Sequence, residues 1–107
     1  MINVLKELRE INDARNVVHF PSCEHWSESD WGNAIAGETG EMCNKIKKRK
    51  LGKPVLIAEV GDEMADIIIY LDLLATKMGI NLEASIVRKF NEKSRELGSN
   101  IMFKGDL

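Results

Sequence analysis

Apolar residues recur along this chain at the three- and four-residue intervals that are typical of an α-helix. The first predicted helix spans residues 3–16, and its apolar stripe consists of Val4, Leu5, Leu8 and Ile11. After a loop over residues 19–28, a second helix begins near Ser27 or Ser29, because either side chain can cap a helix. This helix continues into the basic run of residues 45–50, and Gly52-Lys53-Pro54 then ends the helical pattern.

The longest predicted helix spans residues 54–78, with Pro54 in its first turn, where a missing N–H group is tolerated. Gly79 suits the position just after a helix, and Asn81 can cap a fourth helix that runs to about residue 97. No segment has the alternating pattern of a β-strand. The sequence therefore predicts an all-α fold, a four-helix bundle with short connections, as a single domain over residues 1–107.

Composition narrows the classes of function. The chain is 44% hydrophobic and 30% charged, and its net charge of −2 argues against a dedicated binder of duplex DNA, so we expect no nucleic-acid partner. No signal peptide and no run of about 18 apolar residues is present, which predicts a cytoplasmic protein without a membrane partner. Cys23 and Cys43 are too few for a disulfide scaffold and are expected to be reduced thiols.

Two acidic motifs stand out on the second and third predicted helices. Glu38 and Glu41 are three residues apart, and so are Glu63 and Asp66, which puts each pair on one helix face. Residues 54–76 contain several acidic residues and neither Lys nor Arg, so the charge of the third helix needs compensation from elsewhere. A divalent cation bound between the two helices would supply it. On spacing alone, a solvated acidic face or salt bridges to Lys45, Lys47 and Lys48 remain equally open.

The types of side chain in the two motifs limit which metal ion they are expected to bind. Carboxylate oxygens without a neighbouring His or Cys favour Mg²⁺ or Mn²⁺. Di-iron bundles typically use a Glu-x-x-His motif, whereas both motifs here end in a carboxylate. His19, Cys23 and His25 lie in one loop but lack a clear fourth ligand for zinc, so they are interpreted as ordinary loop residues.

Mg²⁺ is commonly shared between carboxylates and substrate phosphates, which directs attention to phosphate chemistry. Lys45 and Lys48 follow Glu41 at i+4 and i+7 and can neutralise phosphate oxygens, although cations at a helix C-terminus also suit the helix dipole. Aromatic rings near the two motifs offer stacking surfaces for a base, and they can equally belong to the core or to a dimer interface. The candidates for a base or sugar pocket are Trp26, Trp31, Asn33 and Tyr70.

Two segments together resemble the signature of the MazG-like family. Residues 31–48 contain Gly37-Glu38-Thr39-Gly40-Glu41 followed by lysines, and residues 62–71 contain Glu63-Met64-Ala65-Asp66 leading into the apolar Tyr70-Leu71. The later Gly79-Ile80-Asn81-Leu82-Glu83 and Lys89-Phe90-Asn91 are similar to the last helix of the family. The resemblance covers residues 26–98, and the paired motifs in this order are more specific than a single Glu-x-x-Glu.

The resemblance implies an all-α bundle that is completed by oligomerisation and works as a homodimer or as a homotetramer built from two dimers. It implies Mg²⁺-dependent hydrolysis of nucleoside triphosphates to the monophosphate and pyrophosphate, often described as house-cleaning of the nucleotide pool. By motif position, the catalytic metal ligands are Glu38, Glu41, Glu63 and Asp66. Glu59 and Asp62 form a second Glu-x-x-Asp one turn earlier and are candidates for a second metal, and Lys89 is a candidate phosphate contact.

In the expected mechanism, a carboxylate such as Glu38 or Glu41 orients or deprotonates the water that attacks the α-phosphorus, while Mg²⁺ stabilises the developing charge. No protein nucleophile is needed. Two other interpretations stay open. The chain can be a non-catalytic helical bundle that binds nucleotide or a partner protein, or a structural bundle whose helices are stabilised by metal.

Overall fold

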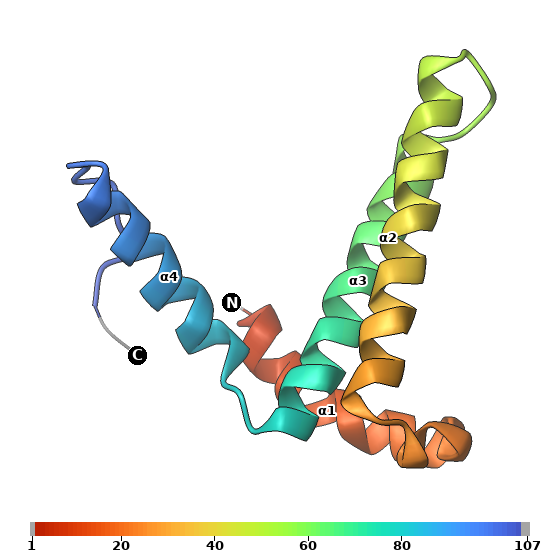
Figure 1. Ribbon diagram of the computed structural model, residues 1–107, viewed down its shortest axis with the longest axis horizontal. Helices are drawn as coiled ribbons and strands as arrows, with labels where there is room; N and C mark the ends of the chain where they lie inside the picture. Colours follow the sequence, from red (N-terminus) through yellow and green to blue (C-terminus); the bar gives the residue numbers. More distant parts are fainter. Residues whose placement is uncertain (1, 106–107) are drawn as a thin grey trace.

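The computed structural model describes residues 2–105, and every regular element in that range is helical (Figure 1). The elements are α1 (Val4–His19), a short 3₁₀ helix η1 (Pro21–His25), α2 (Glu28–Lys50), α3 (Ile57–Met78) and α4 (Leu82–Glu96). The predicted all-α class and the four predicted helices are confirmed. Within residues 2–105 no helix is long and apolar enough to cross a membrane.

Most helix ends follow from local capping chemistry. Ser27, rather than Ser29, caps α2: its hydroxyl accepts a hydrogen bond from the N–H of Asp30, and the Asp30 carboxylate accepts one from the N–H of Ser27. Asn81 caps α4 in the predicted way, through its side-chain oxygen and the N–H of Ala84. Gly79 ends α3 with φ of 70°, a backbone angle that glycine adopts without strain.

Two predicted boundaries were wrong. The first helix continues to His19, beyond the predicted end at residue 16. The third helix begins at Ile57, so Pro54 lies in the connection and not in the first turn. The cause is Glu59, whose carboxylate accepts a hydrogen bond of 2.7 Å from the N–H of Leu56 and thereby supplies the cap at that point.

α2 and α3 form an antiparallel hairpin that is the main packing unit (Figure 1). In residues 2–105 the buried apolar side chains are few, namely Trp31, Val60, Leu73 and Ala75. The radius of gyration is 16.5 Å, whereas a compact domain of this length has about 13 Å. The single chain is therefore an open arrangement around one hairpin, and that hairpin carries both acidic motifs.

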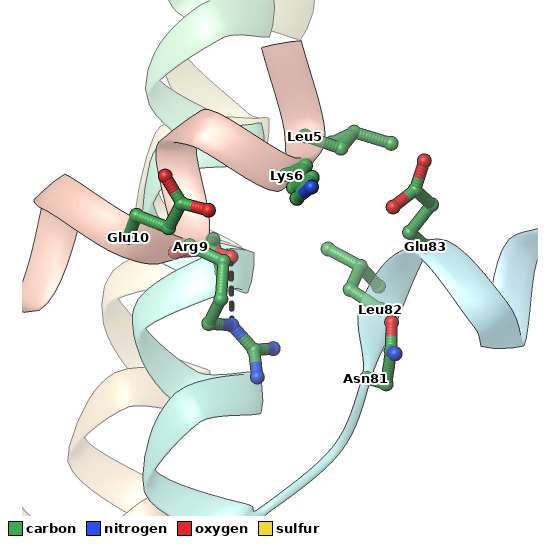
Figure 2. A pocket seen from close by; sticks show the side chains of 8 residues that line it. Leu5, Lys6, Arg9, Glu10, Asn81, Leu82 and Glu83 are labelled. Carbon is green, nitrogen blue, oxygen red and sulfur yellow. Dashed lines mark hydrogen bonds and ion pairs between the residues drawn. The ribbon is translucent and has the colours of Figure 1, made fainter. Parts of the chain in front are cut away.

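α1 crosses the base of the hairpin and is fixed to α3 mainly by polar contacts. Asp72 of α3 is only 2% exposed; its carboxylate pairs with Arg9 at 3.3 Å and accepts a hydrogen bond of 3.0 Å from the Asn12 amide. Arg9 also donates to the carbonyl of Ile80, which ties down the connection to α4. Arg9 also lines a pocket of about 180 Å³ between α1 and the start of α4; Figure 2 shows its side chain with those of the other lining residues.

This junction covers only part of the predicted apolar stripe of the first helix, since Leu5 and Leu8 are half-buried. Val4 and Ile11, two members of the predicted apolar stripe, are 65% and 59% exposed. The face that meets α3 instead carries Arg9 and Asn12, because the buried carboxylate of Asp72 requires polar partners there.

α4 turns away from the α2–α3 hairpin after Gly79 and does not complete a bundle with it (Figure 1). The segment after α4 folds back on it: the N–H of Phe103 donates to Asn91 at 2.8 Å, and the Ser94 hydroxyl donates to the carbonyl of Ile101 at 2.7 Å. The outer side of α3 stays uncovered, with Ile57, Met64 and Ile68 exposed. A bundle closed by one chain is therefore not what the structure contains.

We predict that Asp72→Ala lowers the free energy of unfolding by about 2–4 kcal/mol, because Arg9 and Asn12 lose their buried acceptor. Urea denaturation measures this change. Glu92→Ala is the matched control, since it removes only exposed ion pairs of α4 and is expected to cost less than about 1 kcal/mol. Equal effects of the two variants would contradict the role given to Asp72.

Candidate metal centre

The α2–α3 hairpin brings three of the predicted carboxylates together. One oxygen from each of Glu38, Glu41 and Glu63 lies within 4.8 Å of the others. Glu38 and Glu41 share a face of α2 through their i, i+3 spacing, and Glu63 faces them from α3. Their exposure is graded: Glu63 is buried at 7% exposure, Glu38 is half-buried and Glu41 is exposed. A cation at this point would be held from the protein side and open to solvent on the other.

Glu63 supplies the test of whether this group suits a metal ion. Its Oε1 accepts a hydrogen bond of 2.7 Å from the Lys45 ammonium. Its Oε2 is buried and has no hydrogen-bond partner among residues 2–105. A buried carboxylate oxygen without a partner is costly. Three converging carboxylates, one of them with such an oxygen, fit a hard divalent cation.

The charges of the cluster shift its pKa values in a consistent pattern. Burial, the close Glu63 carboxylate and the charges of Glu41 and Asp66 raise the pKa of Glu38 from its ordinary 4.5 to about 7. The hydrogen bond from Lys45 lowers the pKa of Glu63, and the same bond raises the pKa of Lys45. The Lys45 ammonium is thus the one cation near several carboxylates, and it pairs with Glu63. Glu38 is the carboxylate whose protonated form is favoured.

The Lys45–Glu63 pair also means that one alternative interpretation of the acidic motifs is partly realised, since an inter-helix salt bridge was expected from Lys45, Lys47 or Lys48. A single ammonium compensates only part of the charge of four neighbouring carboxylates. The salt bridge therefore accompanies the candidate metal centre and does not replace it.

Asp66, the fourth predicted ligand, stands outside the three-carboxylate group. It is exposed, lies one turn beyond Glu63 on α3, and its charge contributes to the raised pKa of Glu38. It also lines a neighbouring cavity of about 210 Å³. Asp66 therefore lies between the carboxylates and that cavity, and its role as a ligand stays a prediction.

The same cavity contains three of the four residues predicted for a base pocket: Trp26, Trp31 and Tyr70. The ring centroids of the two tryptophans are 4.6 Å apart, and Tyr70 meets Trp31 edge-on at 5.9 Å. Burial, together with the charges of Glu38 and Asp66, raises the pKa of Tyr70. Asn33, the fourth predicted residue, is exposed on α2 and is not among the residues that line the cavity.

The remaining predicted residues lie apart from the cluster or have local roles. Glu59, a candidate for a second metal, caps α3, and Asp62 is exposed. Lys48 is exposed near the end of α2. Lys89 lies on α4 and pairs with Glu92 at 3.6 Å, on a helix that points away from the hairpin (Figure 1). The roles of these residues in metal or phosphate binding stay predictions.

Within residues 2–105, the three glutamates are the only group of His, Cys, Asp and Glu side chains close enough to hold a metal. His19, Cys23 and His25 do not form such a group. Cys23 and Cys43 are free thiols, as predicted.

Sequence reasoning missed the contribution of α1 to the cavity. Asn12, Arg15 and Asn16 line it together with the aromatic rings. These residues follow i, i+3, i+4 spacing on one helix face. The signal was present in the sequence, because Asn12 stands four residues after Leu8, at a position where the apolar stripe should continue.

The MazG-like family model matches residues 40–102, more than half of the chain. This protein belongs to the MazG-like family. The match includes Glu41, Glu63 and Asp66, whereas Glu38 and the two tryptophans lie before it. No curated protein and no solved structure matches this chain. Membership of the family points to a nucleotide pyrophosphohydrolase.

The raised pKa of Glu38 predicts a pH dependence of stability in the metal-free protein. A group whose pKa is higher in the folded state than in the unfolded state stabilises the fold at low pH, and this contribution is lost as the pH rises through the folded-state value. With EDTA present, the melting temperature of the wild type should therefore fall relative to that of Glu38→Gln between about pH 5 and about pH 8.

Added Mg²⁺ should reverse this loss at the upper end of the range, because a cation favours the ionised carboxylate. Thermal unfolding of the two proteins with and without Mg²⁺ measures both effects. Parallel pH profiles for the wild type and Glu38→Gln would show that Glu38 does not titrate in the way described.

Proposed function

We propose that this protein hydrolyses nucleoside triphosphates, ribo- or deoxyribo-, to the monophosphate and pyrophosphate, with Mg²⁺ as the cofactor and Mn²⁺ as a substitute. The observation that carries the proposal is the group of Glu38, Glu41 and Glu63, whose oxygens converge within 4.8 Å beside a cavity lined by aromatic rings. The carboxylates suit a phosphate-bound cation, and the cavity suits a base. Asp66 lies where the two meet and is proposed as the fourth ligand.

Each side chain has a defined task in this reaction. Glu38, Glu41 and Glu63 would hold the Mg²⁺, which would supply positive charge for the phosphate oxygens and a lowered pKa for the attacking water. Glu38 or Glu41 orients that water and accepts its proton. The water oxygen bonds to the α-phosphorus, the bond to the bridging oxygen breaks, and pyrophosphate leaves. Lys45, already within the cluster, and Lys48 are proposed to contact the departing phosphates.

The reaction is tested by resolving its products. With Mg²⁺ and the common nucleoside triphosphates, we predict equal amounts of monophosphate and pyrophosphate, and no product when EDTA is added. Glu41→Gln, which removes one charge from the cluster, should lower kcat/KM by more than about 100-fold while the protein stays folded.

Release of diphosphate and orthophosphate would mean that the γ-phosphorus is attacked and the proposed reaction is wrong. Nucleotide binding without any turnover would favour the alternative, a non-catalytic bundle that holds nucleotide. Unfolding of Glu41→Gln would favour a structural metal. Glu24→Gln, an exposed carboxylate of η1, serves as the control that should retain full activity.

We further propose that a second copy of the chain covers the outer side of α3, as a homodimer or within a homotetramer. Ile57, Met64 and Ile68 repeat at helical spacing on that side and are 74%, 50% and 41% exposed. Apolar stripes of this kind support an interface with another chain. Charge also favours a second copy, because residues 57–76 of α3 have no basic side chain whereas α4 carries Arg88, Lys89, Lys93 and Arg95.

In such a dimer Lys89 would serve the carboxylates of the partner chain, since α4 leads away from those of its own chain. Glu41→Gln and Lys89→Ala are each expected to lose activity when pure. When the two variants are unfolded together and refolded, half of the dimers are mixed, and each mixed dimer regains one complete site. We predict about a quarter of wild-type activity in the mixture.

If Lys89 acted within its own chain, every site of the mixed dimer would still lack one group and no activity would return. Sedimentation equilibrium of the wild type is the independent check, because a monomer would overturn the proposed dimer whatever the activity. A mixture of Glu41→Gln with Glu38→Gln is the matched control, since both substitutions affect the same site and cannot complement.

A further inference from the structure

The cavity beside the carboxylates has one deeply buried polar side chain in its wall. Asn12 is 3% exposed and comes from α1, whereas Trp31 and Tyr70 enter the cavity from α2 and α3. Asp66 lines the same cavity, so one ligand can reach both Asp66 and Asn12. A nucleotide whose phosphates lie at the carboxylates would therefore have its base on the side of Asn12.

The hydrogen bonds of Asn12 fix the orientation of its amide. Nδ2 has two hydrogens, and both are used: one bond of 2.9 Å goes to the carbonyl of Ile69 and one of 3.0 Å to a carboxylate oxygen of Asp72. Both partners are acceptors only, so the amide cannot flip without placing oxygen against oxygen. The part of the Asn12 amide left for a ligand is Oδ1: no group of residues 2–105 donates a hydrogen bond to it, and it is not fully sealed from solvent.

The surroundings hold this acceptor in place before any ligand arrives. Asp72 is itself held by Arg9 at 3.3 Å, and it is 2% exposed. The Asn12 amide is therefore held between α1 and α3 in the wall of an aromatic-lined cavity. A fixed acceptor of this kind favours binding of a ligand that has an N–H group at this position. A ligand without that group binds more weakly, because the acceptor then loses its hydrogen bond to water and gains none in return.

We propose that Asn12 is a specificity-determining residue, whose Oδ1 accepts a hydrogen bond from an N–H on the pairing edge of the nucleotide base. The inference deepens the proposed function and rests on it, since it names what the same site reads in its substrate. Trp26, whose ring is half-buried in the same cavity, supplies a stacking surface for the base, and Asn12 reads its edge.

The test removes the donor from the substrate and the acceptor from the protein, singly and together. The parent is whichever of ATP, CTP and UTP the wild type hydrolyses best. Its analogue lacks the edge N–H: purine riboside triphosphate for ATP, 2-pyrimidinone riboside triphosphate for CTP and N3-methyluridine triphosphate for UTP. Each pair is measured with the wild type and with Asn12→Ala, and Asn33→Ala is the matched control because Asn33 lies outside the cavity.

For the wild type and Asn33→Ala, we expect kcat/KM to fall at least about tenfold from parent to analogue. For Asn12→Ala the two substrates should be hydrolysed equally, because the acceptor is gone. A purely structural role of Asn12 would lower both rates and leave their ratio unchanged. The wild-type comparison stands by itself if Asn12→Ala fails to fold.

Two results would overturn the inference: a wild type that hydrolyses parent and analogue equally, or a tenfold difference that persists in Asn12→Ala. If no triphosphate is hydrolysed, the proposed reaction fails separately. The same ratio is then measured as dissociation constants of the monophosphates, by the quenching of tryptophan fluorescence. An equal affinity for both monophosphates, or no binding of either, would then also overturn the role of Asn12.

Discussion

The placement of Glu63 in the interface between α2 and α3 is the constraint on which the rest of the site depends. A carboxylate at 7% exposure, on a helix with no basic residue for most of its length, must take its compensation from the opposite helix. Lys45 supplies one hydrogen bond to Oε1 and leaves Oε2 without a partner. Glu38 and Glu41 then add negative charge at the same point. This concentration of carboxylates between α2 and α3 suits the binding of a cation and does not suit closer apolar packing of the two helices.

A second group of polar contacts, around Asp72, positions the cavity beside the carboxylates. Asp72 fixes Arg9 and Asn12, and through them it sets α1 across the base of the hairpin. That crossing closes the cavity against Trp31 and Tyr70 and leaves Asp66 at the boundary with the carboxylates. The two buried carboxylates of α3 thus have different roles. Glu63 lies at the centre of the carboxylate cluster, and Asp72 fixes α1 in the position that forms the cavity. Few apolar side chains are buried in the described part of the chain, so these polar contacts carry much of the specificity of the fold.

The helices and the carboxylate group could be predicted from the sequence because both rest on local spacing. Glu38 and Glu41 share a helix face whatever the tertiary structure, and short connections make the second and third helices neighbours. The role of α1 could not be predicted in this way, because Asn12 gains its importance only from contact with Asp72, sixty positions further along the chain. The start of α3 was misplaced because Pro54 looked like a first-turn residue, whereas the Glu59 cap at Leu56 places the first residue of the helix three positions later, at Ile57. The direction of α4 could not be predicted from local sequence patterns, because an amphipathic helix can pack equally well against its own chain or against another chain.

The central claim is that Glu38, Glu41 and Glu63 form a site for a divalent cation. Electron paramagnetic resonance of Mn²⁺ tests it most directly, because protein-bound Mn²⁺ loses the sharp signal of the free ion. Titration of Mn²⁺ should show saturable binding to the wild type, competition by Mg²⁺, and binding lost in Glu63→Gln but retained in Glu92→Gln, which changes an exposed carboxylate of α4. Mn²⁺ that stays free with the wild type, or binds Glu63→Gln as tightly, would contradict the account.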